Sequence, residues 1–151
     1  MNLTIATIAK QINASFEGDA SLLIDAISID SRSLQNGPHT LFFALIGPNN
    51  DAHSYIIDLI QQGVTHFVVQ YIPEDCVGKA HFLVVQNTLA ALQELASYHR
   101  SLFHFPVIGV TGSNGKTIVK EWLNFLLSPD YSIIRSPKSY NSQVGVPLSV
   151  L

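Results

Sequence analysis

The sequence predicts an α/β fold, and three observations lead to that prediction. Helical and strand patterns alternate along the 151 residues. Continuous apolar runs such as Leu41–Ile46 are typical of strands buried on both faces of a parallel sheet. A glycine-containing loop, Gly109–Thr117, lies between a predicted strand and a predicted helix. With 47% apolar and 13% charged residues, the chain has enough apolar side chains for a core, which excludes intrinsic disorder.

The first half of the chain begins with a short amphipathic helix. Residues 5–12 place apolar side chains at the i, i+3, i+4 and i+7 positions after Thr4, a suitable N-cap. Residues 26–30 alternate between apolar and polar, which predicts a half-buried strand. The run Leu41–Ile46 predicts a buried strand that ends at Gly47-Pro48.

A helix, two strands and a longer helix follow. Residues 55–62 predict a helix that ends at Gly63, and residues 66–69 and 81–85 predict strands. The longest helical stripe then runs through Leu89, Leu92, Leu95, Ala96, His99 and Phe103. The order of these elements indicates an N-terminal α/β domain that spans residues 1–104.

Residues 105–151 predict the beginning of a second domain. The expected elements are a buried strand at 106–111, a helix at 117–127 and a strand at 131–135. In the helix, Trp122 stands at helical spacing with Ile118, Phe125 and Leu126, which predicts a stripe that faces a core. This unit is too small to form its own domain, so we expect it to open a larger parallel sheet and the chain to be a fragment.

Charge and cysteine usage exclude several classes of function. The net charge of −3 gives no basic field, so we expect no nucleic-acid partner. The longest apolar run is far shorter than the roughly 20 residues that cross a bilayer, so we expect no membrane insertion. The lone Cys76 excludes an internal disulfide and fits a cytoplasmic location, while Glu74 and Asp75 beside it disfavour a reactive thiol. The histidines other than His53 (His39, His66, His81, His99 and His104) lack the spacing of a zinc site.

The most informative stretch is the loop at residues 112–117. Gly112 and Gly115 allow backbone N–H groups to converge on an anion, together with those of Ser113 and Asn114, at the N-terminus of the following helix. Lys116 supplies a cation for ATP phosphates, and Thr117 carries a hydroxyl suited to Mg²⁺. Val110 stands where the strict Walker pattern has its first glycine, so the loop is a variant. The alternative is an ordinary strand-to-helix turn that contains Gly-Lys-Thr.

Residues 111–117 resemble the T-G-[ST]-N-G-K-T loop of the Mur ligase family, the ATP-dependent amide ligases of peptidoglycan precursor synthesis. The resemblance extends over the chain. Asp30-Ser31-Arg32, Leu41–Gly47 and Asp51-Ala52-His53 are similar to the D-S-R, l-F-f-A-l-x-G and D-G-H signature of the family's N-terminal domain. In the family this domain holds the UDP end of the UDP-N-acetylmuramoyl substrate.

Downstream residues indicate a branch of the family. Lys120-Glu121 and Asn141–Leu148 resemble the K-E and N-N-x-I-G-V-P-L stretches of the ligases that add D-Ala-D-Ala to UDP-N-acetylmuramoyl-tripeptide. The resemblance implies that ATP phosphorylates a carboxylate of the tripeptide and that the amine of D-Ala-D-Ala attacks the acyl phosphate. Ser136–Tyr140 resembles the form of this ligase that is fused to an alanine racemase.

The resemblance implies a catalytic role for Lys116 and substrate-binding roles for Ser31, Arg32, His53 and Asn141. Each residue also has a structural interpretation. Arg32 can pair at the surface with Asp30 or Asp25, and Ser31 and His53 can each cap a helix. A guanidinium is nevertheless well suited to a diphosphate, which it binds with two parallel hydrogen bonds.

Some residues depart from the family pattern. Ala52 replaces a glycine, which would strain a turn with positive φ; Ser142 replaces an asparagine; and Ile118-Val119 replaces two threonines. We expect the family's catalytic carboxylate, its carbamylated lysine and the rest of the ligase chain beyond Leu151, so that these 151 residues alone are inactive. Two alternatives remain, a small P-loop NTPase or kinase and a non-catalytic module that binds sugar nucleotides. The first is disfavoured because most of the chain precedes the loop.

Overall fold

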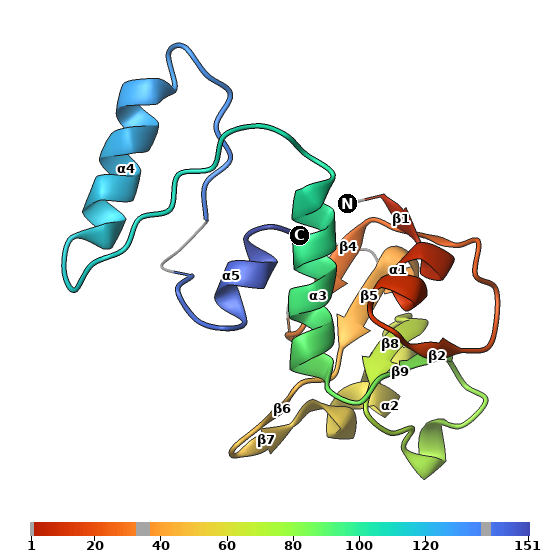
Figure 1. Ribbon diagram of the computed structural model, residues 1–151. Helices are drawn as coiled ribbons and strands as arrows, with labels where there is room; N and C mark the ends of the chain where they lie inside the picture. The colour runs from red at the N-terminus through yellow and green to blue at the C-terminus, as the bar shows by residue number, and fades with distance from the viewer. Residues whose placement is uncertain (1, 33–36, 137–139) are drawn as a thin grey trace.

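A five-stranded sheet forms the centre of the computed structural model, which describes residues 2–32, 37–136 and 140–151. Its strand order is β2-β9-β8-β5-β4 (Figure 1). Four strands run parallel to their neighbours: β4 (Ala26–Ser28), β5 (Thr40–Phe43), β8 (His66–Val69) and β9 (His81–Val84). The edge strand β2 (Ser15–Phe16) pairs antiparallel with β9. The sheet is therefore mostly parallel, as the apolar runs predict.

Helices cover both faces of this sheet. Helices α1 (Ile5–Gln11) and α3 (Thr88–Ser101) pack on one face, and α2 (Ile56–Gln61) packs on the other. Within β5, Leu41 and Phe43 belong to the α1 and α3 side, whereas Phe42 belongs to the α2 side. All three side chains are fully buried. The predicted α/β class is confirmed, and no described helix is both long and apolar enough to span a membrane.

The predicted helices and strands of the first hundred residues are present with shifted ends. Thr4 caps α1 as expected, since its hydroxyl accepts a hydrogen bond from the Thr7 N–H at 3.2 Å. Gly63 follows α2 with a φ of 91°, the left-handed conformation that the pattern requires. The run 41–46 does not form one strand. It leaves the sheet after Phe43, and Ile46 is 49% exposed in a separate hairpin.

Several short elements have no counterpart in the sequence prediction. Strand β1 (Leu3–Thr4) pairs antiparallel with β3 (Leu23–Ile24), and β6 (Ile46–Gly47) pairs with β7 (Asn50–Asp51). Single turns of 3₁₀ helix also occur: η1 (Gly37–His39), η2 (Ala52–Tyr55) and η3 (Glu74–Cys76). Elements of two to four residues are too short to show a helical or strand period, which is why the pattern missed them.

Helix α4 (Lys116–Leu127) stands apart from the rest of the molecule (Figure 1) and buries none of its residues. Trp122, Phe125 and Leu126 are 66%, 77% and 66% exposed, so the expected core-facing stripe has no cover among the described residues. The strands expected at 106–111 and 131–135 are wrong here as well. A strand needs a neighbour to accept and donate its backbone hydrogen bonds, and neither segment has one in the described chain.

The segment after α4 returns to the first hundred residues. Lys120 Nζ donates to the Ser136 carbonyl at 2.9 Å, and Arg135 forms an ion pair with Glu121, which ties this segment to α4. The chain then reaches α5 (Gly145–Leu148), which packs on α3. Gln93 Nε2 donates to the Gln143 carbonyl at 3.2 Å. The last twelve residues thus contact the first unit, while the division at residue 104 stays a prediction.

Two histidines stack at the amino end of the parallel strands. His66 opens β8 and pairs in register with His81, which opens β9, and their ring centroids are 4.8 Å apart. His66 is only 5% exposed. Burial, together with the nearby charge of His81 and against the opposing effect of Asp19, lowers its pKa from 6.5 to about 4. His66 is therefore neutral at pH 7 and serves as a packed, uncharged ring at the start of β8.

Acid should destabilise the protein through His66. Because the pKa of His66 is lower in the folded than in the unfolded chain, the unfolded chain takes up a proton first as the pH falls. The resulting loss of stability begins near pH 6.5 and is complete near pH 4. The melting temperature of His66→Asn should fall less than that of the wild type between pH 7.5 and pH 4.5. His104→Asn, a change at an exposed histidine, is the control and should follow the wild type; equal slopes for all three proteins would contradict this role.

Candidate functional site

Loops from three parallel strands meet at the carboxyl edge of the sheet. Residues 29–32 follow β4, the β6–β7 hairpin follows β5, and Gln70-Tyr71 follows β8. The first two border a hollow of about 530 Å³, whose lining consists of Ile29, Asp30, Ser31, Arg32, Asn50, Ala52 and Tyr55. Ligands of parallel α/β sheets bind outside the carboxyl ends of the strands, so this hollow is a candidate binding site.

Arg32 lies at the rim of this hollow in a bidentate pair with Asp30. Its Nε donates to Asp30 Oδ1 at 2.9 Å and its Nη2 donates to Oδ2 at 3.1 Å, while the Arg32 backbone N–H also donates to Oδ1. These hydrogen bonds hold the pKa of Asp30 below its usual value. The Arg32 side chain is 86% exposed, and Ser31 is half-buried in the lining. The surface pairing is thus present, and it fixes the guanidinium beside the hollow.

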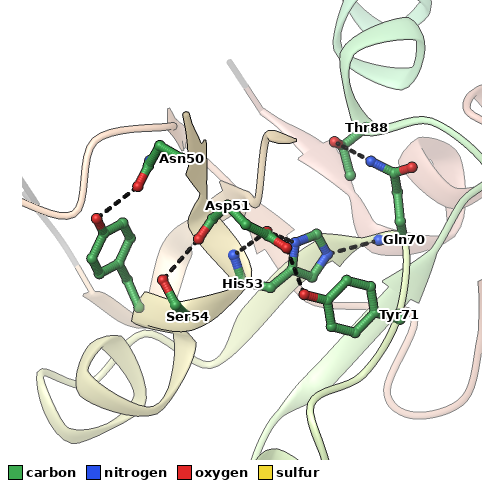
Figure 2. A network of polar contacts seen from close by, with 8 residues as sticks. Asn50, Asp51, His53, Ser54, Gln70, Tyr71 and Thr88 are labelled. Carbon is green, nitrogen blue, oxygen red and sulfur yellow. Dashed lines mark hydrogen bonds and ion pairs between the residues drawn. The ribbon is translucent and has the colours of Figure 1, made fainter. Parts of the chain in front are cut away.

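The opposite wall of the hollow is held by a network of polar contacts around Asp51 (Figure 2). Asp51 Oδ1 accepts hydrogen bonds from the His53 backbone N–H at 2.9 Å and from His53 Nδ1 at 2.6 Å. Asp51 Oδ2 accepts one from the Tyr71 hydroxyl at 2.6 Å. Where the wall borders the hollow, the Tyr55 hydroxyl donates a hydrogen bond to Asn50 Oδ1 at 2.8 Å.

His53 is the centre of this wall rather than part of its surface. The ring is 1% exposed and stacks on Tyr71 with centroids 4.2 Å apart. Its Nε2 accepts the backbone N–H of Gln70 at 3.0 Å, so the proton of the neutral ring lies on Nδ1. Both nitrogens are engaged, and as placed the ring offers neither to a ligand. Asp51, not His53, caps η2.

The backbone also decides whether Ala52 is strained in this wall. Asn13 is the one residue other than glycine with a positive φ in the described chain, so Ala52, which stands at the glycine position of the D-G-H pattern, is not strained. Its methyl group packs instead in the core cluster beneath α2. Partial burial raises the pKa of Asp51, but the hydrogen bonds from Tyr71 and His53 outweigh burial and keep that pKa below the usual value.

The phosphate-loop candidate lies at the N-terminus of α4. Gly115 precedes the helix with a φ of 75°, and Gly112 has a φ of 142°, two conformations that side chains rarely adopt. A Cβ at Gly115 would meet nothing within 4 Å, so its requirement is conformational. The first turn of α4 carries no acidic residue. Backbone N–H groups at the start of this helix therefore remain an attractive site for an anion.

Lys116 folds back over this loop. Its Nζ donates to the carbonyl of Gly112, and the Ser113 carbonyl lies 3.5 Å away. The ammonium group is thereby held above the loop that would receive a phosphate, and Thr117 follows it on the first turn of the helix. Ser113 and Asn114 are exposed between the two glycines. This arrangement fits the group that the sequence pattern implies, a nucleoside triphosphate.

No protein-family profile matched the chain. Among curated proteins, the UDP-N-acetylmuramoyl-tripeptide–D-alanyl-D-alanine ligase of Haemophilus influenzae is 32% identical over all of this chain and over 33% of its own length. Among solved structures, MurF from Acinetobacter baumannii superposes with a TM-score of 0.89 at 27% identity, covering 99% of this chain and 33% of the MurF chain. MurF from Thermotoga maritima in complex with ADP gives a TM-score of 0.72 at 29% identity, over 83% of this chain and 28% of its own.

The chain belongs to the MurF branch of the Mur ligase family. It spans about a third of the length of the MurF ligases that it matches. The mostly parallel sheet and its flanking helices correspond to the N-terminal region of these proteins. The resemblance to a racemase fusion rests on Ser136–Tyr140, of which residues 137–139 lie outside the described chain, so it stays a prediction.

The structure does not bring the expected substrate residues of this MurF-type chain into one hollow. Ser31 and Arg32 line the hollow at the carboxyl edge, whereas His53 lies buried behind its wall. Asn141 lines a second hollow of about 510 Å³ between α3 and α5. Beside Asn141, Ser142 accepts the Gly145 N–H at 2.9 Å, so the serine that replaces asparagine serves the turn into α5.

Sequence reasoning missed three residues of the first hollow and its wall. Asn50 directly precedes the Asp51-Ala52-His53 motif, and Tyr55 lies five residues after Asn50. The residues flanking this motif could therefore have indicated both side chains. Tyr71 contacts Asp51 from twenty residues away along the chain, and no local pattern links the two.

Proposed function

We propose that this chain is the N-terminal part of an ATP-dependent ligase that joins D-Ala-D-Ala to UDP-N-acetylmuramoyl-tripeptide in peptidoglycan synthesis. The observation that carries the proposal is the superposition of 99% of the chain on MurF with a TM-score of 0.89. The ADP complex of a second MurF structure supports ATP as the nucleotide. A nucleotide-linked substrate and a lone cysteine are consistent with a reaction in the cytoplasm.

We assign the two substrates to different units. Residues 1–104 bind the UDP end of the tripeptide substrate in the hollow at the carboxyl edge, where Ser31 and Arg32 face it. Arg32 binds the diphosphate through its guanidinium, which Asp30 holds in place. His53 supports the wall of this hollow, and Asn141 contacts the substrate from the segment before α5. Residues 105–151 begin the central ATP-binding domain.

The loop at 112–117 holds ATP for the first of two chemical steps. The γ-phosphoryl group passes from ATP to a carboxylate of the tripeptide, which yields an acyl phosphate and ADP. The amine of D-Ala-D-Ala then attacks the acyl carbon, loses a proton and displaces phosphate as the amide forms. Lys116 and the N-terminus of α4 stabilise the charge on the transferred phosphoryl group.

Thr117 is the residue of this chain that would contribute to binding Mg²⁺, which neutralises phosphate charge when bound. The remaining catalytic groups of the ligase lie outside the 151 residues, which cover only a third of the relatives. The chain by itself is therefore expected to bind substrates without turning them over.

Replacing Lys116 should abolish most of the turnover of the complete ligase. Lys116→Ala removes a cation whose contact strengthens as charge develops on the phosphoryl group, so kcat should fall about 10²- to 10³-fold. Steady-state phosphate release measures this, and the melting temperature should change little because the hydrogen bonds of Lys116 in the described chain go to its own loop. Lys79→Ala, at an exposed lysine, is the control. A variant that kept most of its kcat would contradict the phosphate-loop assignment.

Replacing Arg32 should weaken binding of the UDP-linked substrate and leave the binding of ATP unchanged. One charge-assisted contact far from the reacting carboxylate acts as uniform binding, so Arg32→Ala should raise KM for UDP-N-acetylmuramoyl-tripeptide about 10- to 100-fold. Lys10→Ala serves as the control for loss of a surface cation. A wild-type KM in Arg32→Ala would mean that the arginine only pairs with Asp30. A parallel rise in KM for ATP would mean that the two substrates do not bind to separate units divided near residue 105.

Trp122 reports whether α4 belongs to a larger domain. It is the chain's single tryptophan and is 66% exposed, so its fluorescence in the 151-residue chain should resemble that of tryptophan in water and be quenched strongly by acrylamide. In the complete ligase the Trp122 contribution, taken as the difference from Trp122→Phe, should shift to shorter wavelength and resist quenching. Equal quenching in both proteins would contradict the assignment of 105–151 to a buried sheet.

A further inference from the structure

We propose that Tyr71 is a positioning residue for the nucleotide-sugar substrate, acting through Asp51 on the wall formed by Asn50 and Tyr55. The inference rests on the proposed function, in which the hollow at the carboxyl edge takes the UDP end of that substrate. Tyr71 itself is absent from the lining of the hollow. Its effect is therefore transmitted, and each link of the transmission is a contact in the structure.

The first link joins the loop after β8 to the β6–β7 hairpin (Figure 2). The Tyr71 hydroxyl donates to Asp51 Oδ2 at 2.6 Å, and the Tyr71 ring stacks on His53 at an interplanar angle of 10°. The hydrogen bond to the carboxylate raises the pKa of the Tyr71 hydroxyl, so that the tyrosine stays a donor at neutral pH. Asp51 thus receives a donor from a part of the chain that is distant in sequence.

The second link is the backbone around Asp51. Asp51 ends β7 and caps η2, so that its neighbours Asn50 and Ala52 take their positions from the same carboxylate. Both neighbours line the hollow. Tyr55 at the end of η2 closes the wall by donating to Asn50 at 2.8 Å. Fixing the Asp51 side chain therefore fixes three lining residues at once.

The third link anchors the wall to the sheet. His53 Nε2 accepts the N–H of Gln70, the first residue after β8, and Gln70 Nε2 donates to Thr88 Oγ1 on α3 at 3.4 Å. The backbone of the loop that carries Tyr71 is thereby held independently of the tyrosine hydroxyl. Removing that hydroxyl leaves this anchor and the stacked ring in place. The variant Tyr71→Phe should therefore fold, with only Asp51 Oδ2 deprived of its donor.

A merely structural tyrosine and a positioning tyrosine differ in what they change. Tyr71 is 48% exposed and Asp51 is 38% exposed, so water can replace the lost donor and the melting temperature should change little. A wall that has gained freedom must be ordered again when the ligand binds, which weakens affinity. Affinity measured well below the melting temperature therefore separates the two roles.

The experiment is calorimetric titration of the 151-residue chain with UDP-N-acetylmuramoyl-tripeptide at 15 °C. Tyr71→Phe should weaken binding about 3- to 10-fold, the range expected for one hydrogen bond, and leave ATP affinity unchanged. Tyr131→Phe, a change at an exposed tyrosine next to α4, should bind as the wild type does. The loss caused by Tyr71→Phe should shrink in a Tyr55→Phe background, because that change already opens the same wall.

The possible failures are distinct. A wild-type chain that binds the probe together with a Tyr71→Phe variant of equal affinity would overturn the positioning role and leave the proposed function standing. Losses that add fully between Tyr71→Phe and Tyr55→Phe would likewise overturn transmission through Asp51. A wild-type chain that binds no UDP-N-acetylmuramoyl-tripeptide would overturn the proposed function of the hollow, and the inference with it.

Discussion

The constraint on which this structure depends is that parallel strands must be covered on both faces. Each of β5 and β8 is buried along its whole length, and alternate side chains enter two separate cores. Such strands leave only their ends for polar residues. Because the strands are parallel, their carboxyl ends gather loops from distant parts of the chain at one edge, and the candidate substrate hollow is formed there.

The two ends of the sheet use histidine in opposite ways. At the amino end, His66 is buried against His81 with a depressed pKa and stacks as an uncharged ring. At the carboxyl end, the equally buried His53 has a carboxylate at Nδ1 and a backbone donor at Nε2, so its ring connects the hairpin to the sheet. Burial and hydrogen-bond partners, not residue type, determine which histidine can organise a site.

In the C-terminal third, the apolar faces are not covered as those of the first sheet are. Helix α4 forms from its own sequence, with Gly115 at its N-terminus, but its apolar side chains have no sheet beside them in the described chain. The segments on either side of α4 have strand-like sequences and no partners, so they form no strand. Helix hydrogen bonds are local, whereas strand hydrogen bonds require a neighbour, and this difference explains why one element formed and two did not.

The sequence by itself determined the α/β class, the three α-helices and four parallel strands of the first hundred residues, the phosphate-loop candidate and the family. These features depend on short-range periodicity, on caps such as Thr4 and on motifs that read along the chain. Only the tertiary structure decided that Arg32 lies in a pair with Asp30 beside a hollow, that His53 is buried, and that Tyr71 reaches Asp51. Those contacts depend on where side chains lie once the sheet has packed. No repeating pattern along the sequence indicates them.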